Sequence, residues 1–176
     1  MIAFFQKIID VLDECETPYM LSGSIAMGIY IIPRATRDFD FIVHLQPEDV
    51  AQFVENFKDG FYCDKDAVAD AVKRQSLFNI IDFESGYKAD FVILSQNEFR
   101  KEEFSRKRKV DYFGKHVSVV TAEDLLLSKI IWIQELQSAV QQEDIKNLSA
   151  LESLDWKYIN EWIVTLKLNT FDLLPQ

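Results

Sequence analysis

The sequence predicts an α/β (α+β) protein: a mixed β-sheet flanked by helices, followed by a C-terminal helical segment. Up to about residue 120, short β-rich runs alternate with amphipathic helical stretches, and from Thr121 onward the pattern is wholly helical. The chain has 176 residues, of which 48% are hydrophobic and 27% are charged, the balance of one ordinary folded domain. We therefore expect an α/β core over residues 1–120 and a helical region over residues 121–176 that packs on it.

Periodicity and turn residues predict the individual elements of the core. Apolar positions at helical spacing indicate helices, and β-rich or alternating runs bounded by turn residues indicate strands. The expected helices are residues 2–16, 25–32, a helix that starts at Pro47 and closes at Gly60, a helix capped by Asp64 with Ala67, Val68, Ala71 and Val72 on its inner face, and 96–105. The expected strands are residues 19–21, 38–45, 77–83, 87–94 and a pair around 113–115.

The helical region begins at a capping motif. Thr121, with Asp124 three residues later, resembles a capping box. The expected core face of this first helix is Leu125, Leu126, Ile130, Ile133 and Leu136. Further helices are expected over residues 142–151 and 155–168, and the three tryptophans are interpreted as packing residues: Trp132, Trp156 and Trp162.

The overall charge argues against one class of partner. The formal net charge is −10 and the sequence pI is about 4.7, so extended DNA or long RNA is disfavoured, because phosphate contacts need a positive surface. One basic run, residues 100–109, either forms a solvated face balanced by neighbouring glutamates or provides a rim for phosphate or RNA. A nucleotide held through a divalent cation remains compatible with this charge.

The N-terminus and the two cysteines indicate a cytoplasmic protein. The first residues lack a basic region and run directly into an amphipathic pattern, so we expect no signal peptide. No apolar run approaches the roughly 18 residues of a membrane span, and no membrane association is expected. Cys15 and Cys63 lie far apart without metal-type spacing, which is typical of thiols in a reducing compartment.

An acid–apolar–acid strand carries the most informative chemistry. Side chains two residues apart on a strand point to the same face, so Asp38 and Asp40 project together while Phe39 and Phe41 face the core. Two adjacent carboxylates repel each other unless a cation lies between them, and hard oxygen ligands suit Mg²⁺ or Mn²⁺. A third acid, Asp90, lies on a separate strand and converges on the pair if the two strands are neighbours.

A glycine–serine turn upstream strengthens this interpretation. Gly23 at a strand-to-helix turn lets the backbone approach a ligand closely, and the following N–H groups face an anion at a helix N-terminus. Ser24 adds a hydroxyl for a phosphate oxygen. Each feature alone also fits an ordinary turn or a surface acid pair, whereas the combination indicates a metal–nucleotide site.

These three pieces resemble the signature of the polymerase-β-type nucleotidyltransferase superfamily. The matching segments are Leu21-Ser22-Gly23-Ser24, thirteen residues later Asp38-Phe39-Asp40-Phe41-Ile42, and then Lys88-Ala89-Asp90-Phe91-Val92. Within the superfamily the chain is most similar to small bacterial AbiEii-like proteins and minimal nucleotidyltransferases. The resemblance implies the nucleotidyltransferase fold for the core.

The resemblance also implies a reaction. A nucleoside monophosphate would pass from an NTP to an acceptor hydroxyl, with Asp38 and Asp40 holding the metal and Asp90 completing a second metal and deprotonating the acceptor. The flanking cations Arg37, Arg34 and Lys88 either bind the triphosphate or balance the charge of the acids. The acceptor stays open between a small molecule such as a sugar or an antibiotic, an RNA end, and a protein.

Two later residues are candidates by the same resemblance. AbiEii-like proteins carry a lysine and a later aspartate after the third acid, and here these are Lys129 and Asp144. Along one unbroken helix they would lie about 22 Å apart, so they can share a site only if the helix breaks, near residues 141–142. The alternatives are a surface lysine and a helix-capping aspartate.

Two other functions remain open at this point. The chain could be a catalytically inactive binding protein with the same fold, or a toxin-like component of a toxin–antitoxin or phage-defence pair with an antitoxin-like protein partner. A purely structural acid cluster would bind Mg²⁺ only feebly, and so metal titration separates it from the others.

Overall fold

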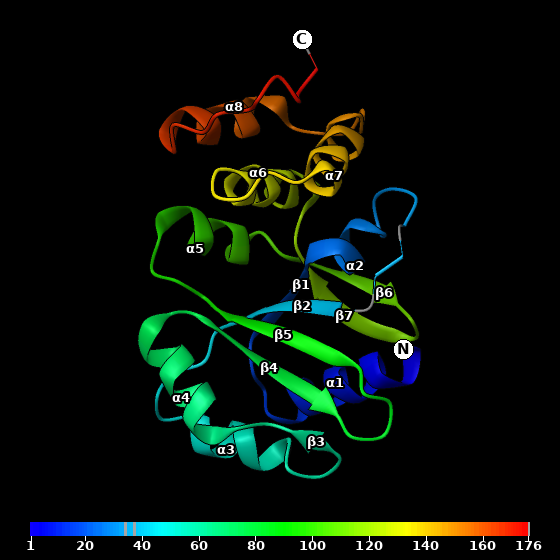
Figure 1. Cartoon of the computed structure of the whole chain (residues 1–176), viewed down its shortest axis with the longest axis vertical. Helices are drawn as coiled ribbons and strands as arrows, with labels where there is room; N and C mark the ends of the chain where they lie inside the picture. Colours follow the sequence, from blue (N-terminus) through cyan, green and yellow to red (C-terminus); the bar gives the residue numbers. More distant parts are fainter. Residues whose placement is uncertain (34, 37, 176) are drawn as a thin grey trace.

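The computed structural model describes residues 1–33, 35–36 and 38–175. In this described part, a seven-stranded mixed sheet has the strand order β3-β4-β5-β2-β1-β7-β6 (Figure 1). Strand β1 pairs with β7, and β2 with β5, in parallel; the other neighbours are antiparallel. The strands are β1 (Tyr19–Ser22), β2 (Asp38–Val43), β3 (Phe61–Tyr62), β4 (Leu77–Asp82), β5 (Lys88–Ile93), β6 (Arg108–Tyr112) and β7 (Lys115–Val119).

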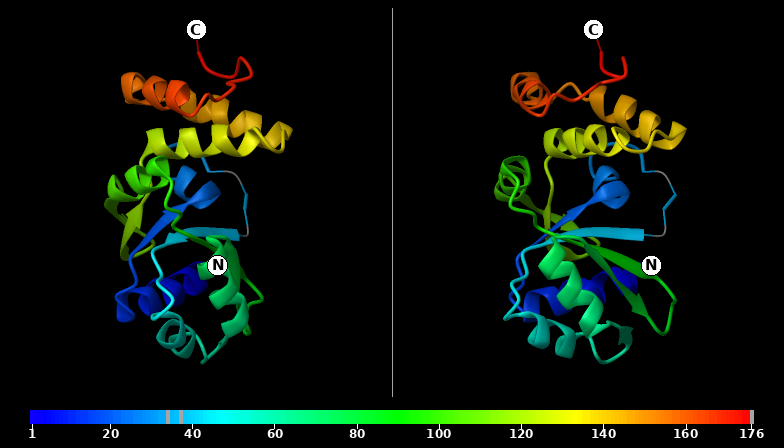
Figure 2. Two further views of the ribbon diagram at one scale, coloured as in Figure 1. Left: turned by 90° about the vertical axis from the view of Figure 1, so that its left-hand side faces the viewer. Right: turned by 60° about the vertical axis from the view of Figure 1, so that its left-hand side comes forward.

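Helices cover both faces of this sheet (Figures 1 and 2). Helices α1, α3 and α4 lie on one side, and α2, α5 and the three C-terminal helices lie on the other, with α8 outermost. The helices are α1 (Ile2–Glu14), α2 (Gly23–Met27), α3 (Val50–Asn56), α4 (Lys65–Arg74), α5 (Glu98–Ser105), α6 (Ala122–Ile133), α7 (Ala139–Ser149) and α8 (Trp156–Thr165). The predicted α+β fold with a mixed, helix-flanked sheet is confirmed.

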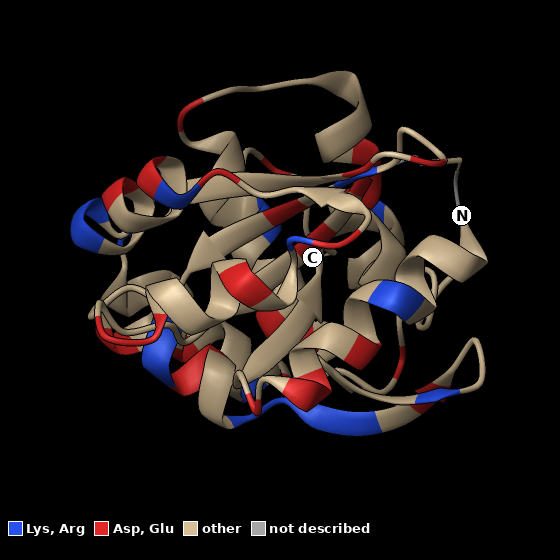
Figure 3. Ribbon diagram, turned by 90° about the horizontal axis from the view of Figure 1, so that it is seen from below, with Lys and Arg blue, Asp and Glu red and all other residues tan. Residues whose placement is uncertain are grey.

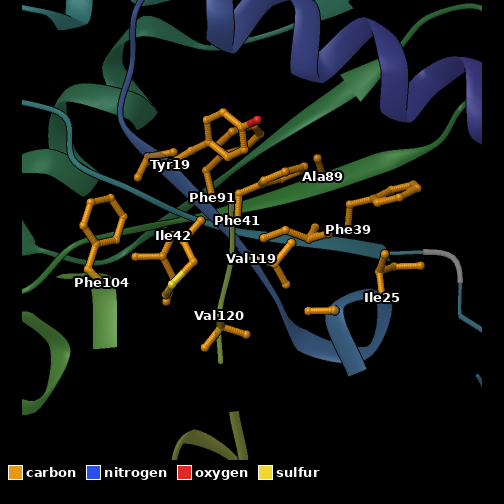
Figure 4. Packing of buried hydrophobic residues seen from close by; sticks show 14 of the residues in the cluster. Tyr19, Ile25, Phe39, Phe41, Ile42, Ala89, Phe91, Phe104, Val119 and Val120 are labelled. Atoms are coloured by element: carbon orange, nitrogen blue, oxygen red, sulfur yellow. The ribbon is translucent and has the colours of Figure 1, made fainter. Parts of the chain in front are cut away.

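Alternation along β2 and β5 separates an aromatic core from a polar face. Phe39 and Phe41 are fully buried, as the period-two pattern predicts. Phe41 and Phe91 of β5 lie together in the core (Figure 4) and stack with ring centroids 5.3 Å apart. Phe5 of α1 stacks on Phe39, also with ring centroids 5.3 Å apart. Burying these rings stabilises the pairing of β2 with β5, which leaves the acids of both strands on the opposite face.

Most predicted elements exist, with shifted ends. The hairpin of β4 and β5, the strand pair β6–β7 and the Asp64 cap, whose carboxylate accepts from the Ala67 N–H, are confirmed. Helix α2 ends at Met27, earlier than predicted, and α3 begins at Val50 because Pro47 lies in the preceding turn. The placement of Ala67 on the inner face of α4 was wrong, since it is exposed.

The helical region begins at Thr121 as predicted, and its side chain caps α6 by accepting from the Asp124 N–H. Two predictions in this helix were wrong. Leu136 and Trp132 are 65% and 58% exposed, because α6 ends at Ile133 and its last turns face a cavity and solvent instead of the core. Trp156 and Trp162 do pack against the core.

A buried carboxylate ties the last helix to α6. Asp124 is fully buried and accepts hydrogen bonds from Tyr158 Oη at 2.6 Å, Arg106 Nε at 2.9 Å and Thr121 Oγ1 at 2.6 Å. The Tyr158 bond comes from α8 and the Arg106 bond from the segment after α5. A buried charge with this many donors fixes the relative position of three segments.

The basic run is largely occupied by contacts inside the molecule. The Arg106 guanidinium lies 3.9 Å from the Tyr158 ring centroid, and the Lys107 ammonium lies 3.9 Å from that of Phe104. Arg108 Nε donates to the Tyr30 hydroxyl at 3.1 Å. Lys and Arg positions are interspersed with Asp and Glu around the ribbon (Figure 3). These contacts favour a structural role for most of the run over a rim that binds RNA.

The described residues include no helix that is both long and apolar enough to cross a bilayer. Cys15 and Cys63 carry free thiols.

Candidate active site

Parallel pairing of β2 with β5 brings the predicted acids together. In the register of the two strands, Asp40 lies directly opposite Asp90, and Asp38 lies opposite Lys88. Neighbouring strands are about 4.8 Å apart, so the Asp40 and Asp90 backbones are adjacent and their side chains share one face. The two strands are therefore neighbours, and Asp90 converges on the Asp38–Asp40 pair as predicted for that case.

Crowding of these acids changes the protonation of Asp40. Burial, together with the neighbouring Asp90 and Asp38 carboxylates, raises its pKa to about 6, while Lys129 and Lys88 oppose the shift. Near neutral pH the group is ionised, yet it is held in an environment that disfavours negative charge. A divalent cation placed between the carboxylates would relieve both the burial and the repulsion.

Asp90 has two partners in this arrangement. One carboxylate oxygen accepts from the Asn79 side-chain amide, and the other accepts from Lys88 Nζ at 2.9 Å. Asn79 lies opposite Asp90 on β4, and sequence reasoning did not single it out. In the sequence, Asn79 is recognisable only as a polar residue on the exposed face of an otherwise apolar strand. Its partner cannot be identified until the register of β4 and β5 is known.

The Gly23 turn is built against the Asp40 carboxylate. Gly23 has φ +63°, and a Cβ placed on it would lie 1.9 Å from Asp40 Oδ2. No side chain fits in that gap, and so the glycine is required by close approach as well as by its backbone conformation. Ser24 follows in α2, and both residues line the same cavity as Asp40.

That cavity has a volume of about 420 Å³ and lies between the sheet and the helices α5, α6 and α7. Of the predicted site residues, it is lined by Gly23, Ser24, Asp40 and Lys129; Asp38, Asp90 and Lys88 lie outside its lining. The lining also includes Gln75, Ser128, Trp132 and Gln141, which the sequence did not indicate as site residues, and Arg100, which it placed only in the basic run. Arg34 and Arg37, the other predicted cations, lie outside the described residues.

Lys129 and Asp144 do share a site. Lys129 Nζ donates to Asp144 Oδ2 at 2.7 Å, with Gln141 Oε1 at 3.4 Å, and the side chains of the pair are 8% and 2% exposed. The chain breaks over residues 134–138 between α6 and α7, a few residues before the predicted position. The alternatives of a surface lysine and a capping aspartate were wrong, since both residues are buried inside helices.

The donor chemistry of the acids suits a hard cation, but the side chains are not already arranged as a closed metal site. Across residues 1–33, 35–36 and 38–175, no group of three His, Cys, Asp or Glu side chains is positioned to hold a metal ion. Lys88 Nζ is bound to Asp90 and would have to leave it for a cation to contact all three carboxylates. Asp40 and Asp90 have the oxygen ligands that Mg²⁺ and Mn²⁺ prefer.

No protein-family model matches the chain, and no curated protein matches it in sequence. Several solved structures are similar to it in fold. The antibiotic-resistance factor ANT(2'')-Ia in solution has a TM-score of 0.64 at 12% identity, covering 94% of this chain and 90% of that one. The lincosamide antibiotic adenylyltransferase LnuA with bound lincomycin has a TM-score of 0.57 at 14% identity, covering 85% and 95%.

A third similar structure is an antigenic nucleotidyltransferase-like protein from Paracoccidioides brasiliensis, with a TM-score of 0.51 at 13% identity over 94% and 88% of the two chains. Identities this low establish the fold alone, and the AbiEii-like subgroup stays a prediction. The architecture agrees with the motif that carries the acids and the Gly23 turn. The chain therefore has the fold of these nucleotidyltransferase structures.

Proposed function

We propose that this protein transfers a nucleoside monophosphate from an NTP to an acceptor hydroxyl and releases pyrophosphate. The observation that carries the proposal is the direct register of Asp40 with Asp90, with the Gly23 backbone pressed against the Asp40 carboxylate. Adjacent carboxylates on neighbouring strands beside a glycine turn form the arrangement that the family motif implies. Asp38, on the same face of β2, is the third proposed ligand.

A Mg²⁺ or Mn²⁺ ion at these acids would neutralise the phosphate charge that develops during transfer. Asp40 and Asp38 would bind it from β2, and Asp90 would contribute from β5 and accept the proton of the attacking hydroxyl. Asn79, bound to one Asp90 oxygen, orients that carboxylate. Because phosphoryl-type transfer depends mainly on positioning and charge neutralisation, this small set of groups is sufficient.

The cations and the turn would bind the triphosphate. Lys129 is held in place by Asp144 and lines the cavity, so its ammonium is positioned before a nucleotide enters. Gly23 and Ser24 line the same cavity, where a backbone N–H and a hydroxyl can donate to phosphate oxygens. Lys88 would exchange its bond to Asp90 for a phosphate oxygen. We also propose that Arg37 binds the triphosphate, one of the two roles that the sequence leaves open for it.

The acceptor is proposed to be a small molecule. ANT(2'')-Ia has also been solved with adenylyl-2''-tobramycin, with a TM-score of 0.63 at 13% identity over 94% and 96% of the chains, and LnuA with lincomycin. A cavity of about 420 Å³ is within the range of small-molecule sites. The alternatives are an RNA or protein acceptor and a toxin-like role with an antitoxin-like partner. We also propose a cytoplasmic location, where NTP is available.

Calorimetric titration of ATP, GTP, CTP and UTP with and without Mg²⁺ tests this proposal. We expect metal-dependent binding by the wild-type protein and none by the double variant Asp38→Ala/Asp40→Ala. Asp59→Asn, at an exposed turn, is the matched control that also removes a carboxylate and should bind as the wild type does. Absence of metal-dependent binding of every NTP by the wild-type protein would refute the site.

One observation favours a second candidate, a nucleotide-binding protein without catalysis. The Lys88 ammonium occupies Asp90, the proposed base, at 2.9 Å and would block it if the pair persisted in the complex. Release of pyrophosphate from bound NTP, followed in the presence of a mixture of hydroxylated compounds, separates the two candidates. Metal-dependent binding without pyrophosphate release under any condition would favour the inactive protein.

A further inference from the structure

The cavity contains a second anchored cation that the proposed reaction has not used. Arg100 of α5 lines the cavity, and its Nη1 donates to Glu103 Oε2 at 2.8 Å and to Ser128 Oγ at 2.6 Å. Ser128 in turn donates to Glu103 Oε1 at 2.5 Å, and Glu103 is fully buried. The guanidinium is therefore held by a buried carboxylate and a hydroxyl from two different helices.

Only part of this guanidinium is occupied. Its hydrogen bonds all use Nη1, and in the residues that the structure describes neither Nε nor Nη2 has a protein acceptor. The side chain is 28% exposed. Two neighbouring nitrogens of a fixed guanidinium form the fork that binds a carboxylate or phosphate with two parallel hydrogen bonds. Arg100 thus presents a preorganised site for an oxyanion.

Arg100 belongs to α5, which follows the end of β5 that runs away from Asp90. Ser95, just before α5, also lines the cavity. It lies five residues of extended chain beyond Asp90, a distance of about 16 Å. A triphosphate bound between Gly23 and Lys129 would leave the part of the cavity near Arg100 free.

Part of the wall near Arg100 is apolar, because Trp132 lies one helical turn after Ser128, to which Arg100 donates. Val92 of β5 and Trp132 of α6 line the cavity, and their side chains are 38% and 58% exposed. An exposed tryptophan at the edge of a cavity offers a flat surface on which a ring or hydrocarbon body can lie. This part of the cavity therefore combines an apolar wall with one fixed oxyanion site.

We infer that Arg100 binds a carboxylate or phosphate group of the acceptor, and that Trp132 and Val92 contact the apolar body of the same molecule. The inference rests on the proposed function and names its substrate class: a hydroxylated, partly apolar acceptor with an anionic group. A cationic group of an acceptor is disfavoured beside the Arg100 guanidinium itself, because like charges repel. This acceptor class differs from that of ANT(2'')-Ia.

The test uses benzoate and benzamide, which have the same ring and differ in charge. Each is titrated into the protein with and without Mg²⁺ and the non-hydrolysable ATP analogue AMPCPP, while NMR follows the arginine Nε–H signals. The signal lost in Arg100→Lys identifies Arg100. We expect benzoate to shift this signal and to bind roughly 10- to 100-fold more tightly than benzamide, the effect of a charged hydrogen-bonded pair.

Arg100→Lys keeps a positive charge beside Glu103 but loses the fork. We expect it to fold, as checked by thermal unfolding, and to lose most of the preference for benzoate. Lys101→Gln removes a charge from the exposed side of the same helix and should keep the preference. The same preference in Arg100→Lys as in the wild type would overturn the inference, as would equal binding of benzoate and benzamide to the wild type.

Titrations with and without the nucleotide analogue show whether the acceptor or the triphosphate supplies the oxyanion that Arg100 binds. If the acceptor supplies it, benzoate binds equally well with and without Mg²⁺–AMPCPP. Competition between benzoate and the analogue, or weaker binding of the analogue to Arg100→Lys, would assign Arg100 to the triphosphate and overturn the inference. If the proposed function alone fails, the analogue does not bind, whereas benzoate still binds at Arg100.

Discussion

Replacing Gly23 with alanine should disrupt the candidate site through a single atom. The new Cβ would lie 1.9 Å from Asp40 Oδ2, 2.6 Å from its Cγ and 2.8 Å from its Cβ, all closer than real Cβ contacts allow. Asp40 belongs to the central strand β2 and cannot retreat as a whole, so its carboxylate must rotate or the turn must open. Either movement separates Asp40 from Asp90.

The magnitude has two parts. An L-residue at φ +63° costs roughly 1–2 kcal/mol, and overpacking against a confined neighbour costs roughly a further 1–3 kcal/mol. Gly86, in the hairpin loop, provides the matched control, because it has φ +68° with nothing within 4 Å of its Cβ position. Gly86→Ala should therefore show only the backbone cost of roughly 1–2 kcal/mol.

Urea unfolding gives the free energy of unfolding of both variants, and calorimetry gives their binding of Mg²⁺–NTP. Gly23→Ala should be less stable than Gly86→Ala and should lose nucleotide binding, whereas Gly86→Ala should keep it. Combining Gly23→Ala with Asp40→Gly removes all three clashing atoms, so the two substitutions should be less destabilising together than their sum. Equal destabilisation of the two alanine variants, or intact nucleotide binding by Gly23→Ala, would refute the close-approach argument.

Three other predictions concern the charged groups. Lys129→Met removes the ammonium that donates to buried Asp144 and should cost about 1.5–3 kcal/mol of stability in thermal or urea unfolding, the worth of a hydrogen bond to a charged group. The double variant Lys129→Met/Asp144→Leu should recover stability but not NTP binding, and recovery of both would contradict the role of Lys129. The pKa of Asp40 is raised from 3.8 to about 6 in the folded protein, so on raising the pH the folded protein keeps the Asp40 proton longer than the unfolded chain does. The stability that this proton contributes is therefore fully present below pH 3.8 and is lost as the pH rises through about 6. Urea midpoints across this interval should therefore show a fall that is absent in Asp40→Asn, and Mg²⁺ affinity should increase as the pH rises through about 6. Lys88→Gln frees Asp90 and should strengthen nucleotide-free Mg²⁺ binding roughly two- to fivefold by calorimetry; weaker binding would show that Lys88 does not compete with the metal.

The sequence was sufficient to predict which side chains of a central strand share a face. It was not sufficient to predict which residues lie opposite each other on neighbouring strands. Alternation of acid and phenylalanine in residues 38–41 predicts which side chains share a face, because the period of a strand is two. That Asp90 lies opposite Asp40, and Asn79 opposite Asp90, depends on register, which long-range packing of rings such as Phe41 on Phe91 determines.

The helical part shows a different limit. A regular apolar pattern predicted α6, yet the pattern continued past its end, so Leu136 was placed in the core although the helix stops at Ile133. The same break brings Lys129 onto Asp144, and local periodicity contains no signal for its position. The sequence placed Arg100 in a basic run that could form either a solvated face or a rim for phosphate or RNA, but not in the cavity, because its position there depends on Glu103 and Ser128.

The buried Asp124 has a consequence for the order of events during protein synthesis. The strands with Asp40 and Asp90 leave the ribosome before Lys129, and Tyr158, which donates to Asp124 and so fixes α6, leaves later still. A nascent chain therefore has the acids proposed as metal ligands well before the lysine near them is held in place. Since a ligand stabilises only the conformation that it binds, NTP should favour the last step of folding, the docking of α6, α7 and α8 over the sheet.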